Sequence, residues 1–188
     1  MEPGTVILII VIAVIVILAV WVIGAYNGLV KLRNMVEEAF ATMDVYLKKR
    51  YDLIPNLVET VKGYAAHESG TLEKVIQARN IASSASTIED KIKGETMLTG
   101  ALKSLFALAE AYPDLKANTN FLDLQGQLQR MEDEIANSRK YYNAIVKEFN
   151  IKVEMFPNNI IAGIFNFVRK PLFEVSEEAE RQTVAVKF

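Results

Sequence analysis

The side chains best suited to acid–base or metal chemistry are few in this sequence. His67 is the only histidine, it is followed by Glu68, and the chain contains no cysteine. Without a second histidine nearby, a structural role for His67 is far more common than metal binding. The lack of cysteine excludes disulfides, thiol nucleophiles and thiolate metal sites. We therefore predict no metal site and no cofactor.

Carboxylates gather in one stretch of the chain and could form an acidic site. They are Glu37, Glu38, Asp44, Asp52 and Glu59. The run Lys48-Lys49-Arg50 lies among them, and this mixture favours a solvated helix face with paired charges. The sequence contains no phosphate loop, dinucleotide-binding glycine pattern, nucleophile elbow or HExxH motif. We therefore expect no catalytic residues and no enzymatic activity.

The overall composition excludes further classes of function. The chain has 188 residues, 51% of them hydrophobic, and its 21 Lys and Arg residues nearly balance its 23 Asp and Glu residues. With 23% charged residues it resembles a folded protein and not a disordered one. A net charge of −2 disfavours nucleic acid as a partner, because such binding needs a strongly basic face.

The most informative segment is an apolar run near the N-terminus. From Val6 to Ile23 no side chain is polar, and as a helix this run is about 27 Å long. With its neighbours it covers the roughly 30 Å hydrocarbon core of a bilayer. A cleaved signal peptide is the alternative, but the run is longer than a signal's apolar region and Glu2 replaces the usual basic residue. Trp21 and Tyr26 are candidates for the membrane interface at its end.

The flanking charges predict the orientation of this anchor. No lysine or arginine precedes the run, whereas Lys31 and Arg33 follow it and Lys48-Lys49-Arg50 come later. The positive-inside rule therefore places the N-terminus outside and the C-terminal part in the cytoplasm, with a single pass through the cytoplasmic membrane.

Beyond the anchor, apolar residues recur at helical spacing. Four helices are predicted: one continuous with the anchor to about residue 50, one from about 53 to 83, one from about 88 to 109, and one from about 121 to 149. Asp52 is the candidate cap of the second, Asn120 caps the fourth, and Thr87 with Asp90 resembles a capping box. The fourth is the clearest, with a stripe typical of a bundle or coiled coil. Its members are Phe121, Leu124, Leu128, Met131, Ile135, Ser138, Tyr142, Ile145 and Phe149.

These elements predict an all-α chain, in which an N-terminal transmembrane helix is followed by an antiparallel four-helix, up-and-down bundle. The expected divisions are 1–4 for a short extracytoplasmic tail, 5–26 for the transmembrane anchor, 27–156 for the helical bundle, and 157–188 for a short amphipathic segment and C-terminal tail. In the alternative, Pro55 only kinks one long helix, and the hairpin lies at Gly70 or at Ser83–Ser86.

The segment after the bundle carries an apolar stripe and two cations. Its candidate membrane-interface residues are Ile161, Phe165, Arg169 and Lys170. The simpler interpretation is that the stripe caps the bundle, and the other is that it binds the membrane surface. With four bundle helices, the chain returns to the bilayer before this segment. With one long helix kinked at Pro55, three passes would place the segment at the far end of the bundle. At the end of the tail, Val184, Val186 and Phe188 could form a strand or dock on the bundle.

Several motifs resemble the LemA family. The longest is Arg50-Tyr-Asp-Leu-Ile-Pro-Asn-Leu57, and Ala109-Glu-Ala-Tyr-Pro-Asp-Leu115, Arg139-Lys-Tyr-Tyr-Asn143 and Phe156-Pro-Asn-Asn-Ile-Ile161 match as well. The resemblance implies a bacterial membrane protein with a helical bundle and no established catalytic residues. The resulting hypothesis is a non-enzymatic scaffold that binds the lipid bilayer, other proteins or further copies of itself as a homo-oligomer. The alternative is an accessory subunit of a membrane protease or quality-control complex.

Overall fold

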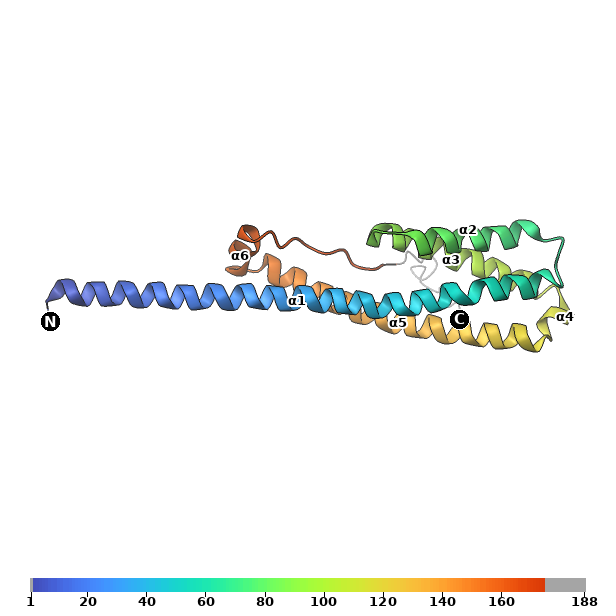
Figure 1. Cartoon of the computed structure of the whole chain (residues 1–188), viewed down its shortest axis with the longest axis horizontal. Helices are drawn as coiled ribbons and strands as arrows, with labels where there is room; N and C mark the ends of the chain where they lie inside the picture. Colours follow the sequence, from blue (N-terminus) through green and yellow to red (C-terminus); the bar gives the residue numbers. More distant parts are fainter. Residues whose placement is uncertain (1, 175–188) are drawn as a thin grey trace, which may run out of the picture. The chain divides into compact units, whose positions relative to one another are not determined.

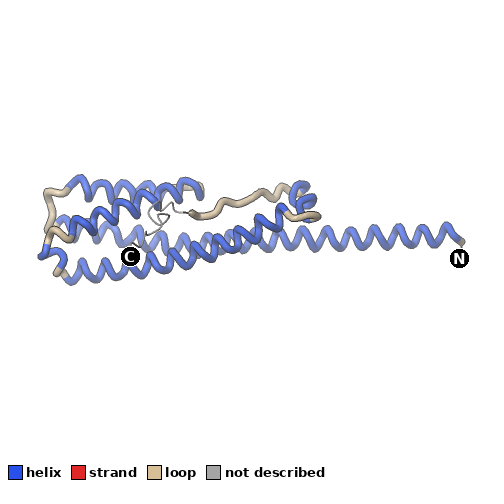
Figure 2. The backbone as a smooth tube through the Cα atoms, turned by 180° about the vertical axis from the view of Figure 1, so that it is seen from behind, coloured by secondary structure: helices blue, strands red, loops and turns tan. Residues whose placement is uncertain are grey.

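The computed structural model describes residues 2–174, and within them every regular element is a helix (Figures 1 and 2). The elements are α1 (Pro3–Lys62), α2 (Ser69–Ser84), α3 (Ile88–Ala109), α4 (Pro113–Lys116), α5 (Thr119–Glu154) and α6 (Asn158–Ile164). The predicted all-α class is therefore confirmed. The tail residues Val184, Val186 and Phe188, for which a strand was considered, lie outside the described residues.

Helix α1 contains 60 residues, which corresponds to about 90 Å. Its N-terminal part has a window long and apolar enough to cross a membrane, and none of that window is buried. Further along, the same helix buries an apolar stripe at intervals of three and four residues. The stripe consists of Leu29, Leu32, Val36, Met43, Leu47, Ile54, Leu57 and Val61. One uninterrupted helix therefore carries both an exposed apolar segment and an amphipathic one.

The predicted start of a second helix near Asp52 is wrong, because α1 continues through Pro55 to Lys62. Proline has no N–H, so it leaves the carbonyl oxygen four residues earlier without its helical partner. That oxygen belongs to Tyr51, and Arg79 of α2 donates a hydrogen bond to it from Nε at 3.3 Å. A side chain from the next helix thus replaces the missing backbone donor. The chain instead turns between Lys62 and Ser69.

A double-mutant cycle tests this replacement. Arg79→Ala should lower the free energy of unfolding by about 1 kcal/mol, because it removes the donor to a carbonyl in a buried environment. In a Pro55→Ala background, residue 55 supplies its own N–H, and the same Arg79→Ala change should cost clearly less. Urea denaturation of the four variants measures the coupling. Equal costs in the two backgrounds would show that Arg79 does not compensate for Pro55.

Helix starts are only partly as expected. The α3 cap is confirmed, since the amide of Asp90 donates to Thr87 Oγ1 at 3.1 Å. For α5, the predicted cap Asn120 is wrong: the amide of Phe121 donates to Oδ1 of Asn118 at 3.0 Å. The two asparagines are two residues apart, and only Asn118 precedes the first helical turn.

The apolar stripe predicted for α5 is confirmed. Seven of its nine members are buried, namely Phe121, Leu128, Ile135, Ser138, Tyr142, Ile145 and Phe149. Ser138, the polar member, donates from its hydroxyl to the carbonyl of Glu134 at 2.6 Å. That bond satisfies a hydroxyl that would otherwise be costly to bury.

The described residues form two compact units, and α1 and α5 each contribute to both. One unit contains residues up to Ala41 together with 141–172. The other contains residues 42–140 and the described residues after 172. In the second unit α2 and α3 pack side by side as a hairpin (Figures 1 and 2). Each unit contains one candidate site: a cluster of aromatic side chains in the first unit and a network of charged side chains in the second.

Candidate functional site

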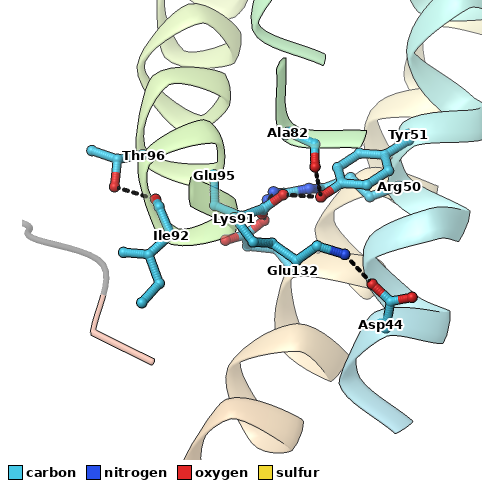
Figure 3. A network of polar contacts seen from close by, with 9 residues as sticks. All are labelled: Asp44, Arg50, Tyr51, Ala82, Lys91, Ile92, Glu95, Thr96 and Glu132. Carbon is cyan, nitrogen blue, oxygen red and sulfur yellow. Dashed lines mark hydrogen bonds and ion pairs between the residues drawn. The ribbon is translucent and has the colours of Figure 1, made fainter. Parts of the chain in front are cut away.

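A network of charged side chains lies inside the unit that contains residues 42–140 (Figure 3). Arg50 of α1 is only 2% exposed. Its guanidinium pairs with the buried carboxylate of Glu95 on α3 and, at 2.6 Å, with Glu132 on α5. Arginine suits this position because its planar group presents several donors to two carboxylates at once. The network thereby links three helices.

Two neighbouring contacts extend the network. The hydroxyl of Tyr51 donates to the second carboxylate oxygen of Glu95. One helical turn earlier on α3, Lys91 pairs with Asp44 of α1, and Lys48 reaches the other oxygen of Asp44 at 3.2 Å. The buried carboxylate of Glu95 and the half-buried carboxylate of Asp44 therefore both have cationic partners, as charges removed from water require.

These contacts correct the interpretation of the acidic stretch as a uniformly solvated face. Glu37, Glu38, Asp52 and Glu59 are exposed as expected. Arg50 is instead buried and Asp44 is half-buried, and their partners Glu95 and Lys91 lie outside the predicted acidic stretch. The spacing of these residues indicates that they are buried. Residue 50 continues the three-four spacing of the α1 stripe, and residues 91 and 95 occupy stripe positions on α3.

The environment of the network shifts two pKa values. Burial raises the pKa of Tyr51 to about 12, outweighing the opposite effect of the Arg50 charge. Burial also acts to raise the pKa of Asp44, but hydrogen bonds and charge from Lys91 and Lys48 outweigh it, and the pKa falls below its usual value. The stabilisation from Asp44 is present above its unfolded pKa of 3.8 and is lost as the pH falls through the lower folded value.

The raised pKa of Tyr51 predicts that the folded protein loses stability in alkali. Its folded pKa of about 12 exceeds the unfolded value of 10.0. Its contribution is therefore complete below pH 10.0 and disappears as the pH rises toward about 12. Tyr51→Phe should remove this component, so that the difference in unfolding free energy between parent and variant shrinks across that range. A constant difference, measured by urea denaturation at several pH values, would contradict the assignment.

The other unit brings several predicted interface residues together. The ring centres of Tyr26 and Phe165 lie 4.7 Å apart, and Tyr26 also contacts Phe167 at 5.9 Å. Trp21, just over one turn before Tyr26 on α1, is 36% exposed, as is Tyr26. Tyr26 of α1 and two phenylalanines that follow α6 therefore form one aromatic cluster just past the apolar run.

The remaining predicted residues differ in their surroundings. Ile161 is 3% exposed and packs inward, so it cannot offer a surface in this conformation. Arg169 is exposed and pairs with Glu154 at 2.9 Å. The backbone of Lys170 is held on both sides by the Asn150 side chain, which accepts from its N–H at 2.8 Å and donates to its carbonyl at 2.9 Å.

Two grooves on the second unit combine apolar walls with a few charged side chains. A groove of about 510 Å³ between α1 and α2 has a largely aliphatic lining that includes Val58, Leu72 and Ile76. A smaller one of about 340 Å³ lies beside Arg50 and Glu132. Within residues 2–174, no group of three histidine, aspartate or glutamate side chains is arranged to hold a metal ion. His67 lies exposed in the turn before α2.

Within the described residues the chain is a helical protein with one candidate membrane-spanning segment near its N-terminus. The LemA family model matches residues 39–188. The chain belongs to the LemA family, as its sequence motifs indicated.

Individual relatives agree with this assignment. Protein LemA of Metamycoplasma hominis is 29% identical over 160 residues, covering 82% of this chain and 71% of the relative. Magnetosome protein MamQ 2 of Paramagnetospirillum magneticum is 26% identical over 79% of this chain. Magnetosome protein MamQ of Magnetospirillum gryphiswaldense is 25% identical over the same share. The chain spans 64% of the length of either magnetosome protein.

Proposed function

We propose that the chain is a single-pass, non-enzymatic scaffold of the bacterial cytoplasmic membrane. The observation that carries the proposal is the continuity of α1. Its exposed apolar section from Val6 to Ile23 has the length of a bilayer core. The same helix then supplies the buried stripe from Leu29 to Val61 without a break. Such a helix ties the position of the folded part directly to the membrane.

The helices that follow the apolar section of α1 are suited to the role of a scaffold. We propose that the second half of α1 packs with α2, α3 and α5 as an antiparallel four-helix bundle. The charge network supports this arrangement, since it joins α1, α3 and α5 through Arg50, Glu95 and Glu132. Its groups are paired with one another and leave no evident acid–base pair for catalysis. Exposed helix faces are then the surfaces available to bind other proteins or further copies.

Orientation is tested with reporter fusions to the C-terminus. Lys31 and Arg33 follow the apolar section, and we predict that they hold this side in the cytoplasm. A fluorescent-protein fusion should therefore be bright, and an alkaline-phosphatase fusion should be inactive. Replacing Lys31 and Arg33 with glutamine is the matched control and should weaken this preference. High phosphatase activity from the parent fusion would reverse the topology.

Crosslinking in intact membranes, followed by purification in mild detergent, tests the scaffold role. Self-crosslinked species, or complexes with non-proteolytic membrane proteins, support a scaffold. A stoichiometric protease in the purified complex would replace the scaffold with the alternative of an accessory protease subunit. Recovery of only the uncrosslinked monomer would contradict both functions.

A further inference from the structure

The strongest unexplained feature is an apolar surface at the end of α5 and around α6. Six residues form it and are exposed by between 48% and 76%: Met155, Phe156, Ile160, Ile164, Phe165 and Val168. We call these six residues the α6 surface. A group of exposed apolar residues of this kind commonly marks a binding site. We propose that the α6 surface inserts into the headgroup region of the same bilayer that α1 spans, so this inference rests on the proposed anchoring.

The α6 surface is one side of a packed segment. On its other side Ile161, Ala162 and Phe167 are buried. The chain leaves α6 through Asn166, whose positive φ of 55° is a conformation that asparagine tolerates better than most residues. The segment therefore has an inner face that packs on the protein and an outer apolar face. This division is what an interfacial membrane contact requires.

The position of the α6 surface along the axis of α1 supports lipid headgroups as its binding partner. Phe165 contacts Tyr26 at 4.7 Å between ring centres. Tyr26 is three residues beyond Ile23, the last residue of the apolar run, which is about 4.5 Å along the helix axis. The N-terminal part of α1 projects beyond α6 in both views (Figures 1 and 2). When that part spans a bilayer, the α6 surface lies where the hydrocarbon meets the headgroups.

Hydrogen bonds hold the segment at this level. Asn150 bonds both backbone groups of Lys170, and the Tyr142 hydroxyl donates to the carbonyl of Pro171 at 3.0 Å. The guanidinium of Arg33 lies 5.4 Å from the centre of the Phe167 ring, a cation–π distance. These contacts fix the returning chain against α1 and α5. The α6 surface is thus presented beside the anchor as a preformed surface.

The nearby charges match a bilayer surface better than an acidic protein partner. Lys31 and Arg33 are exposed on α1 just past Tyr26, and Arg169 is 67% exposed although it pairs with Glu154. Cations beside an inserted apolar face favour anionic headgroups. The apolar surface of the anchor continues into the α6 surface through the Tyr26–Phe165 contact. A lipid surface can cover both without any further partner.

Depth-dependent fluorescence quenching tests the inference on the full chain. The chain has no cysteine, so single substitutions can be labelled with an environment-sensitive dye. Ile164→Cys and Val168→Cys probe the α6 surface, and Ile15→Cys probes the anchor. Glu37→Cys is the matched aqueous control, because it is exposed on α1 about 16 Å beyond Tyr26 along the helix. Vesicles of phosphatidylethanolamine and phosphatidylglycerol carry quenchers near the headgroups or deep in the acyl chains.

The inference predicts blue-shifted emission at residues 164 and 168, with several-fold stronger quenching by the shallow lipid quencher than at residue 37. Residue 15 should respond to the deep quencher. If residues 164 and 168 match residue 37 while residue 15 is quenched deeply, the α6 inference fails and the anchor stands. If they are shielded from both lipid and aqueous quenchers, a protein or a second copy covers them, and the inference again fails. If residue 15 is not quenched, the proposed anchoring itself fails.

Discussion

Replacing Glu95 with glutamine is expected to lower the free energy of unfolding by about 3–5 kcal/mol, the usual cost of breaking a buried ion pair from one side. The variant keeps the shape of the side chain but removes the charge that Arg50 faces. Arg50 is 2% exposed and would retain only the half-exposed Glu132 as a charged partner. Urea denaturation of the detergent-solubilised chain, followed by circular dichroism, gives the difference.

Glu132→Gln is the matched control for this prediction. It removes a carboxylate from the same guanidinium, but the Glu132 side chain is 48% exposed. Solvent screens its interaction, so the expected loss is about 1 kcal/mol or less. Similar losses for the two variants would show that burial does not distinguish the two carboxylates. The buried Arg50–Glu95 pair would then not contribute more to stability than the half-exposed Arg50–Glu132 pair.

Gly94→Ala is expected to destabilise the hairpin of α2 and α3 by about 1–3 kcal/mol, as overpacking does. A Cβ atom built at Gly94 would lie 2.6 Å from the Cα and 2.9 Å from the backbone nitrogen of Ala82. Backbone atoms cannot move aside as the end of a flexible side chain can, so the helices must separate. Thermal unfolding of the intact chain measures the effect.

Gly100→Ala gives the opposite expectation within the same helix. Nothing lies within 4 Å of a Cβ built at Gly100, and the position is exposed. Alanine should therefore raise stability by about 0.5–1 kcal/mol through its better helix propensity. If Gly94→Ala is also stabilising, α2 and α3 do not approach each other as closely as the structure shows.

Residue spacing predicted the mainly apolar stripes of α1 and α5, because burial of one helix face determines which positions are apolar. The helix start predicted near Pro55 is wrong, since Arg79, 28 positions away from Tyr51 in sequence, donates to the carbonyl that Pro55 leaves without its helical partner. Local rules cannot supply such a tertiary donor.

Residue spacing predicted the charge network and the α6 surface only in part, for a different reason in each case. Arg50 and Glu95 occupy stripe positions on two different helices, so their pairing depends on how those helices align. Around α6, the predicted apolar stripe consists of Ile160, Ile161, Ile164, Phe165 and Val168. Four of these residues are exposed, but Ile161 is buried. The helix ends at Ile164 and the chain changes direction at Asn166, so helical spacing no longer applies beyond that point.

The structure corrects the prediction that a helix continuing through Pro55 leaves three passes and places α6 far from the anchor. The chain reverses at residues 63–68 instead of near Pro55, so the number of passes between Tyr26 and α6 is unchanged. The contact between Tyr26 and Phe165 is the direct result.

Hydrogen exchange of the full chain in lipid nanodiscs tests whether one helix both spans the bilayer and enters the folded part. We predict slow amide exchange from Val6 through Ile54, with no gap at residues 24–28, because backbone hydrogen bonds continue from the lipid-embedded section into the packed one. Fast exchange confined to residues 24–28 would divide α1 into an anchor and a separate bundle helix. Fast exchange throughout Val6–Ile23 would show that the segment does not span the bilayer, and either result would contradict the account.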